Sequence, residues 1–317
     1  MAHHHHHTAE DLDLAIDPKL LKPLFKTKSS LHASAFVLDW IIIFATIYVC
    51  LQFLNPLTYI LAVLIVGARM HALAILMHDA THYRFLKNRK WNDLITNIFT
   101  MYPIFTSIEV YRENHMLHHR HLNTEDDPDW VAKLGKKAFT FPKTKKEFLL
   151  TVFSYWTLYQ GITDAIWFFK RFGANKPTAK AKSGLDITRV LFYIVLFTVL
   201  TLTGLWKIYL FFWVIPYLST FFMYQYIRSV AEHYGEMTYD DLYSSSRSLQ
   251  ANPIERFFLA PHNVGYHLEH HLYPAVPFYN LPALHETLMS DEEYRSKAHV
   301  THGYVGGLLD ELGQIPN

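Results

Sequence analysis

Histidines in three short motifs are the residues of this chain that could carry out chemistry. The motifs are HDATH (His78, His82), HMLHH (His115, His118, His119) and HLEHH (His267, His270, His271). A further histidine, His233, lies in AEHYG before the third motif. On a helix, side chains at i, i+3 and i+4 lie on one face, and imidazole is a ligand that suits iron, zinc and copper. The spacing therefore predicts that the motifs converge on a shared metal site.

The number of imidazoles indicates more than one metal ion. Six to nine candidate ligands exceed the four ligands of a structural zinc ion, so we predict two metal ions. Neutral imidazoles with few carboxylates suit a redox-active first-row metal that stays open to a small ligand. The remaining histidines are expected to be structural or exposed, including His32 and His285, while His71 is expected to pack within a span.

Composition excludes several other classes of protein. Of the 317 residues, 50% are hydrophobic and only 18% are charged, below the roughly 25% of soluble domains. The net charge of +1 gives no overall attraction to nucleic acid, so no nucleic-acid partner is predicted. The single cysteine, Cys50, excludes an internal disulfide and a cysteine-bound iron–sulfur site. The run His3–His7 resembles an affinity tag and is set aside.

Four apolar stretches predict an all-α integral membrane protein. They cover about residues 35–54, 57–77, 188–205 and 208–227, and about 20 helical residues cross a hydrocarbon core of roughly 30 Å. Short turns at 55–56 and 204–207 would join them into two hairpins, with a kink at Pro216. Residues 91–110 are predicted to form a re-entrant or interfacial helical segment that does not cross the membrane, and residues 148–169 an interfacial helix. The residues from 228 onward are predicted to form a histidine-rich cytoplasmic cap.

The expected domain organisation follows from these spans. Residues 1–33 form the tag and an N-terminal cytoplasmic segment, 34–290 the membrane domain, and 291–317 a C-terminal cytoplasmic tail. Two hairpins return the chain to one side, so all histidine motifs should share one face. Lysine and arginine crowd the loops on that face, which the positive-inside rule assigns to the cytoplasm. The pattern does not distinguish a bacterial inner membrane from the endoplasmic reticulum.

Two charges lie inside the first predicted hairpin. Asp39 and Arg69 fall at similar depth when counted from the shared side, and each is costly within a membrane. Our hypothesis is that they form an ion pair. The alternative is that each side chain reaches the interface separately.

The histidine motifs and their surroundings resemble the histidine boxes of the membrane fatty acid desaturase superfamily. The resemblance rests on HDATH, NHMLHHRHLNTEDDPD, AEHYG and HNVGYHLEHHLYPAVPFYNLPALH and covers roughly residues 35–290. It implies four spans with a cytoplasmic cap and a non-haem di-iron centre that activates O2. The iron ligands that it implies are His78, His82, His115, His118, His119, His233, His267, His270 and His271. The superfamily also includes hydroxylases and ketolases of lipids, alkanes and carotenoids.

Other polar residues in the motifs are candidates for support of the metal ligands. Asn263 is expected to hold a metal-bound water. His121 is expected to support the metal ligands without binding the metal, and the alternative is that His121 is itself a ligand. Asp79 and Glu269 lie within the motifs, where a carboxylate can accept an imidazole N–H, although each could equally be solvated or paired with arginine. The acidic residues Asp126, Asp127 and Asp129 could cap a helix, bind basic loops or orient ligands, and the sequence does not choose among these roles.

The resemblance, together with the aromatic membrane spans beside the histidine motifs, predicts a desaturase of a fatty acyl chain in a lipid or acyl thioester. A hydroxylase or ketolase of the same superfamily is the alternative, and a non-oxidative metal-binding membrane protein is the alternative from another class. No side chain can deprotonate an unactivated methylene, so the bound metal must supply the oxidising power. Electrons must come from an external ferredoxin or cytochrome b5-type donor, which the basic loops could dock, although these loops could also bind anionic lipids.

Overall fold

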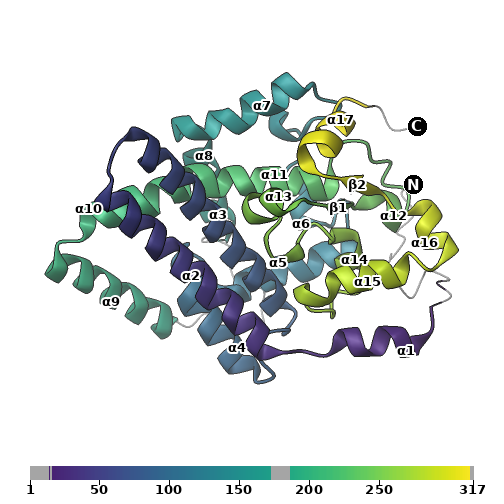
Figure 1. The fold of residues 1–317 in the computed structure, drawn as a ribbon, viewed down its shortest axis with the longest axis horizontal. Coiled ribbons are helices and arrows are strands. Elements are labelled where there is room, and N and C mark those ends of the chain that lie inside the picture. Colours follow the sequence, from purple (N-terminus) through teal and green to yellow (C-terminus); the bar gives the residue numbers. More distant parts are fainter. Residues whose placement is uncertain (1–13, 15, 173–185, 315–317) are drawn as a thin grey trace. The chain divides into compact units, whose positions relative to one another are not determined.

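The computed structural model describes residues 14, 16–172 and 186–314, and the chain divides into two compact units. Unit 1 consists of Met1–Leu31, Arg112–Val152 and Tyr226–Asn317, and unit 2 of His32–Tyr111 and Phe153–Gln225. Both units are mainly helical (Figure 1). The tag-like run His3–His7 lies outside the described residues, as does part of the predicted basic loop between residues 173 and 185.

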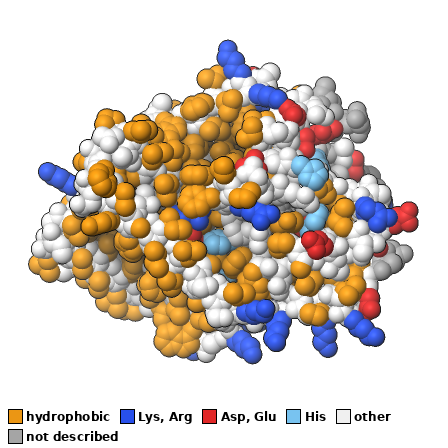
Figure 2. All heavy atoms as spheres, in the orientation of Figure 1, with side chains coloured by type: hydrophobic (Ala, Val, Ile, Leu, Met, Phe, Trp, Pro, Cys, Tyr) orange, Lys and Arg blue, Asp and Glu red, His pale blue; other side chains and the backbone are white. Residues whose placement is uncertain are grey.

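Most residues of the long apolar helices belong to unit 2. Three helical stretches are long and apolar enough to cross a membrane: α2 (Ser29–Gln52), α3 (Pro56–Thr81) and the stretch Trp206–His233, which runs from α10 (Trp206–Tyr209) to α11 (Phe222–His233). Asn55 caps α3, with Pro56 at its first position. Figure 2 shows hydrophobic side chains over α2, α3, α9 and α10 with few charges among them. Such a surface is suited to lipid.

The fourth predicted span corresponds to α9 (Ile187–Thr203), an apolar helix of 17 residues. At about 1.5 Å per residue it is about 26 Å long, which is shorter than a hydrocarbon core of roughly 30 Å. Both of its ends are defined, because the Asp186 side chain caps the first turn and Gly204 ends the helix at φ +69°. The four-span count and the two membrane hairpins therefore stay predictions.

The predicted ion pair between Asp39 of α2 and Arg69 of α3 is confirmed. Arg69 Nη1 donates to Asp39 Oδ1 at 3.0 Å, and both side chains are buried. A buried charge is tolerated when an opposite charge and hydrogen bonds satisfy it. The pair thus joins α2 to α3 within unit 2.

The helix type changes around Pro216, where the sequence predicts a kink, and the kink itself stays a prediction. Two π-helical turns, Leu210–Val214 and Tyr217–Phe221, flank this proline. Proline lacks the N–H that continues an α-helix, and π turns accommodate such a break without ending the helix. The nearby side chains Trp213 and Tyr217 donate to the carbonyls of Pro103 and Ile104.

The two predicted interfacial segments are each divided into shorter helices. Residues 91–110 contain α4 (Arg89–Thr96), a π turn (Asn97–Met101) and the start of α5 (Ile108–His121). Residues 148–169 contain parts of α7 (Lys145–Ser154) and α8 (Tyr159–Phe172). The predicted single helix over 148–169 is wrong, because Leu158 adopts φ +64° after a short 3-10 turn at Tyr155–Thr157.

Two glycines allow close approach of backbones within unit 2. A Cβ on Gly161 of α8 would lie 1.6 Å from the carbonyl oxygen of Leu218, and one on Gly67 of α3 would lie 2.0 Å from Thr220 Oγ1. Thr220 Oγ1 also donates to the carbonyl of Val63 at 2.7 Å. Only glycine leaves room at these crossings, so α3 and α8 pack directly on the π turn at 217–221.

Unit 1 is built from short helices joined by well-bonded turns. Those not yet described are α1 (Pro18–Leu21), α6 (Pro128–Val131), α12 (Leu242–Ser245), α13 (Pro253–Phe258), α14 (His267–Leu272), α15 (Leu281–Leu288), α16 (Glu292–Lys297) and α17 (Leu309–Glu311), with short 3-10 or π turns at Lys22–Phe25, Lys137–Phe139, Pro261–Asn263, Phe278–Asn280 and Tyr304–Leu308. Two strands, β1 (Ser248–Gln250) and β2 (Val300–His302), pair in parallel with Ser248 opposite Val300. The prediction of an entirely α-helical chain missed this small sheet, because three-residue strands leave no clear periodicity.

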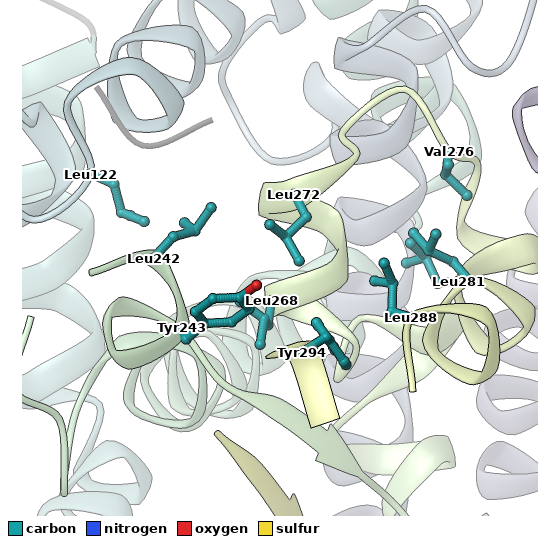
Figure 3. Packing of buried hydrophobic residues seen from close by; sticks show 10 residues of the cluster. Leu122, Leu242, Tyr243, Leu268, Leu272, Val276, Leu281, Leu288 and Tyr294 are labelled. Carbon is teal, nitrogen blue, oxygen red and sulfur yellow. The ribbon is translucent and has the colours of Figure 1, made fainter. Parts of the chain in front are cut away.

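A hydrophobic core in unit 1 includes leucines of α14, the helix that carries the third histidine motif (Figure 3). Leu268 and Leu272 of α14 point into it, together with Leu284 of α15 and Tyr294 of α16. Leu24 and Phe25, near the N-terminus, pack against the same core. Since α14 turns its leucines to this core, its histidines are left on the other faces of the helix.

Candidate metal centre

The second and third histidine motifs are brought together within unit 1. His115, His118 and His119 lie on the part of α5 that belongs to unit 1. All three histidines of the third motif lie on α14, and His233 is the last residue of α11. The predicted convergence of these motifs is therefore observed for seven of the nine candidate ligands.

Four of these histidines form a compact, buried group, here called the four-histidine cluster: His118, His233, His267 and His271. Each offers one ring nitrogen, and these nitrogens all lie within 4.8 Å of one another. His267 Nε2 is 2.9 Å from His233 Nε2 and 3.0 Å from His271 Nε2. Four imidazole nitrogens at these separations match the donor set of a first-row transition metal.

The outward ring nitrogens of two of these four histidines are held by acceptors. His118 Nδ1 donates to Asp127 Oδ2 at 2.9 Å, and His233 Nδ1 donates to the carbonyl of Ser245 at 3.0 Å. His267 Nδ1 lies 3.3 Å from Glu232 Oε1 but forms no hydrogen bond within the described residues. A proton fixed on Nδ1 leaves the Nε2 lone pair turned inward, which is how metal-binding histidines are oriented in proteins. Converging lone pairs repel unless a cation lies among them, so the residues present fit a bound metal ion.

A second group, the three-histidine cluster, consists of His115, His119 and His270. His119 Nε2 is 3.0 Å from both His115 Nε2 and His270 Nε2. In each HxxHH motif, the first and last histidines (i and i+4) thus belong to one cluster, and the middle histidine (i+3) belongs to the other. This partition explains why two adjacent histidines end each motif, because one serves each cluster.

Burial favours the neutral form of two members of the four-histidine cluster, His233 and His267. Burial, together with the nearby His118 charge, lowers the pKa of His233 to about 3. Burial also lowers the pKa of His267 well below its usual value, helped by the neighbouring imidazoles. Burial disfavours the charged form of His118 too, but the hydrogen bond and charge of Asp127 outweigh it and raise the pKa of His118. Neutral imidazoles are the form that binds metal.

The first histidine motif lies at the end of α3 in unit 2. His78 is buried and His82 half-buried, with ring centroids 5.8 Å apart. Asp79, for which the sequence left open whether it orients a motif imidazole, accepts from His32 Nδ1 at 3.2 Å. His32 is fully buried and stacks on Phe85 with ring centroids 4.4 Å apart, so it has a structural role.

The other predicted supporting residues are used elsewhere in unit 1. Asn263 Nδ2 donates to the carbonyl of Phe278 at 3.1 Å. Glu269 is fully buried and bonds with Ser248, His285 and Tyr294 rather than with a motif histidine. His121, the last residue of α5, is half-buried and belongs to neither cluster among the described residues.

Asp127 has two of the three roles that the sequence left open. Its Oδ1 caps α6 by accepting from the N–H groups of Asp129 and Trp130, while its Oδ2 holds His118. Sequence reasoning missed Glu232 and Ser245. The position of Glu232 directly before His233 was an available signal, whereas a backbone acceptor such as Ser245 leaves no trace in residue type.

Asp127→Asn is expected to weaken metal binding about 10- to 100-fold while the protein stays folded. Asparagine caps a helix about as well as aspartate, so α6 should form. The amide cannot supply the same charged acceptor to His118, and loss of such a partner costs this much affinity. Competition with a chelator measures the change, and the exposed neighbour variant Asp126→Asn is the control. Equal affinity in Asp127→Asn and wild type would contradict this role.

Long apolar helices and buried histidine clusters define a membrane-type protein with histidines able to bind metal. Residues 54–304 match the family model described as fatty acid desaturase, and the chain belongs to this family. It is therefore related to oxidoreductases that act on acyl chains.

Three similar proteins illustrate the range of the family. Dihydrorhizobitoxine desaturase of Bradyrhizobium elkanii is 31% identical over 76% of this chain and 70% of its own length. The sn-1 oleoyl-lipid 12-desaturase of Anabaena variabilis is 25% identical over 75% of this chain and 70% of its own length. The human sphingolipid delta(4)-desaturase/C4-monooxygenase DES2 is 26% identical over 77% of this chain and 69% of its own length.

Proposed function

We propose that the protein is an O2-dependent di-iron membrane desaturase that introduces a double bond into a fatty acyl chain of a lipid or acyl thioester. The observation that carries this proposal is the four-histidine cluster, in which buried ring nitrogens converge and the outward nitrogens of His118 and His233 are held by acceptors. Family membership supports the reaction class. The names of two similar proteins, both desaturases, support desaturation, and the name of one of them, sn-1 oleoyl-lipid 12-desaturase, supports an acyl substrate.

The proposed iron ligands form two sets. The four-histidine cluster would hold one iron. The three-histidine cluster would hold the other, and the family motif assigns His78 and His82 as its remaining ligands. This last assignment rests on the HDATH motif alone.

The protein's own side chains would orient the metal ligands, bury the metal centre and exclude water from it. They would not exchange protons with the substrate. Bound iron supplies the oxidation that removes hydrogen from an unactivated methylene with O2. In the overall reaction, one –CH2–CH2– unit of the acyl chain, O2, two electrons and two protons give one –CH=CH– unit and two water molecules. Asp127 and Ser245 hold the ligand rings, so the site needs little reorganisation. Burial of the histidines keeps bulk water from the centre.

Hydroxylation is the second candidate function. The name of the human relative contains both a desaturase and a C4-monooxygenase activity, so one such scaffold supports both outcomes there. Removal of a second, vicinal hydrogen gives the alkene, whereas transfer of oxygen gives an alcohol. The product therefore distinguishes the two.

The proposed setting is a multi-pass membrane protein with α9 as the fourth span and the histidine clusters on the cytoplasmic face. The two electrons would come from an external ferredoxin or cytochrome b5-type donor. The lysines of loop 133–146 offer a basic docking surface for it, and Lys136, Lys137, Lys145 and Lys146 lie there.

Exchange of the metal tests the oxidative proposal. Chelator-stripped protein should regain desaturation with iron(II), O2 and a reductant, and should gain none with zinc, because zinc has no redox chemistry. The product is measured by mass spectrometry of the acyl chains. Equal desaturation with zinc alone would contradict a redox-active, oxygen-activating centre. Tight iron binding without oxidation of an acyl chain, whichever electron donor is supplied, would favour a non-oxidative metal-binding protein.

A further inference from the structure

The turn after α12 joins the two helices that carry most of the four-histidine cluster. The Ser245 carbonyl holds His233, as described above. Two residues later, the backbone N–H of Arg247 donates to the carbonyl of Glu232 at 3.1 Å, and the Arg247 carbonyl accepts from the N–H of Leu268 at 3.2 Å. Arg247 therefore bonds the last turn of α11 and the first turn of α14 at once.

The side chain of Arg247 holds the end of α11. It is fully buried, and its Nη1 donates to the carbonyl of Ala231 at 2.6 Å while its Nη2 donates to the carbonyl of Tyr234 at 3.1 Å. The last carbonyls of a helix have no partner within the helix, and a cation is favourable at this end. The planar guanidinium thus fixes the turn that contains His233.

Glu311 supplies the counter-charge for this buried cation. Its Oε2 accepts from Arg247 Nε at 3.0 Å and lies 2.8 Å from Nη2. Its side chain is only 16% exposed, and it also bonds with His299 and Thr301 beside β2. Glu311 is the last residue of α17 and lies beyond residue 304, where the family match ends.

We propose that Arg247 and Glu311 are positioning residues for the four-histidine cluster, so that the C-terminal segment helps to retain its metal. This proposal rests on the proposed function, because it requires the cluster to bind metal. Without Glu311, the guanidinium would be a buried charge without an anionic partner. Arg247 would then turn toward water and release the carbonyls at the end of α11, and His233 would lose its fixed direction toward His267.

The test uses the purified full chain loaded with cobalt(II), whose visible absorption reports on the ligand geometry. The variant Glu311→Gln keeps the size of the side chain and removes its charge. We expect it to release one of two cobalt equivalents to a chelator about tenfold faster than wild type, as when other groups that orient metal ligands are removed. Asp310→Asn is the matched control, because Asp310 pairs only with the exposed Lys145 in the described chain, and it should release cobalt at the wild-type rate.

A second pair of variants separates positioning from folding. Arg247→Lys keeps the positive charge but loses the planar set of donors, and it should release the same equivalent faster. If Glu311→Gln does not fold, Glu311→Asp retains the charge with a shorter reach and should show an intermediate rate. Wild-type release by folded Glu311→Gln would overturn the inference alone. A wild-type chain that takes up no cobalt would overturn the proposed function as well.

Discussion

The variant His267→Ala is expected to reduce desaturation below detection and to lower bound iron from two ions to about one per chain. His267 is the central member of the four-histidine cluster, since its Nε2 lies 2.9 Å and 3.0 Å from those of His233 and His271. Without the His267 imidazole, the four-histidine cluster loses one metal ligand and also the ring that lies between His233 and His271. Product is measured by mass spectrometry and metal by elemental analysis of the same purified sample.

The matched control for this variant is His302→Ala. His302 is exposed on β2 and belongs to neither cluster among the described residues. It should keep both iron ions and wild-type activity. Two iron ions per chain in folded His267→Ala would show that the cluster does not hold iron.

The variant Gly161→Ala is expected to destabilise the protein by more than about 3 kcal/mol, the range of severe overpacking. The new Cβ would lie 1.6 Å from the carbonyl oxygen and 2.5 Å from the carbonyl carbon of Leu218. Both atoms belong to the backbone, so no side-chain rotation relieves the clash, and α8 must move away from the π turn at 217–221. Thermal unfolding in detergent, followed by size-exclusion chromatography, measures the loss.

Gly306→Ala is the control for Gly161→Ala. A Cβ at Gly306 would meet no atom within 4 Å, so its unfolding temperature should stay near that of wild type. An unchanged unfolding temperature in Gly161→Ala would mean that the close crossing of α8 with the π turn does not exist in the protein.

The histidine arrangement was largely predictable because it depends on local helical geometry. Intervals of three and four residues place imidazoles on one helix surface whatever the rest of the chain does. Asp39 and Arg69 were also predictable as a pair, since a charge inside an apolar helix needs a partner. Both inferences depend on residue type and spacing, which the sequence states directly.

Other features could not be predicted, because they depend on which backbone groups meet in the folded chain. The division of each HxxHH motif between two clusters requires the relative rotation of α5 and α14. The role of Ser245 uses a carbonyl that every residue possesses, and the buried partner of Arg247 lies 64 positions away at Glu311. The break at Leu158 depends on a left-handed conformation that its residue type disfavours.

The most direct test of the central claim is the mass spectrometry of lipids from cells that express the wild-type chain or His270→Ala. The proposal predicts an acyl species lighter by two hydrogen atoms with the wild-type chain and absent with the variant. Its fragmentation would identify the acyl chain and the new double bond. A species heavier by one oxygen atom would contradict desaturation and establish hydroxylation. The same lighter species in both cultures would contradict the assignment of the histidine clusters as the catalytic centre.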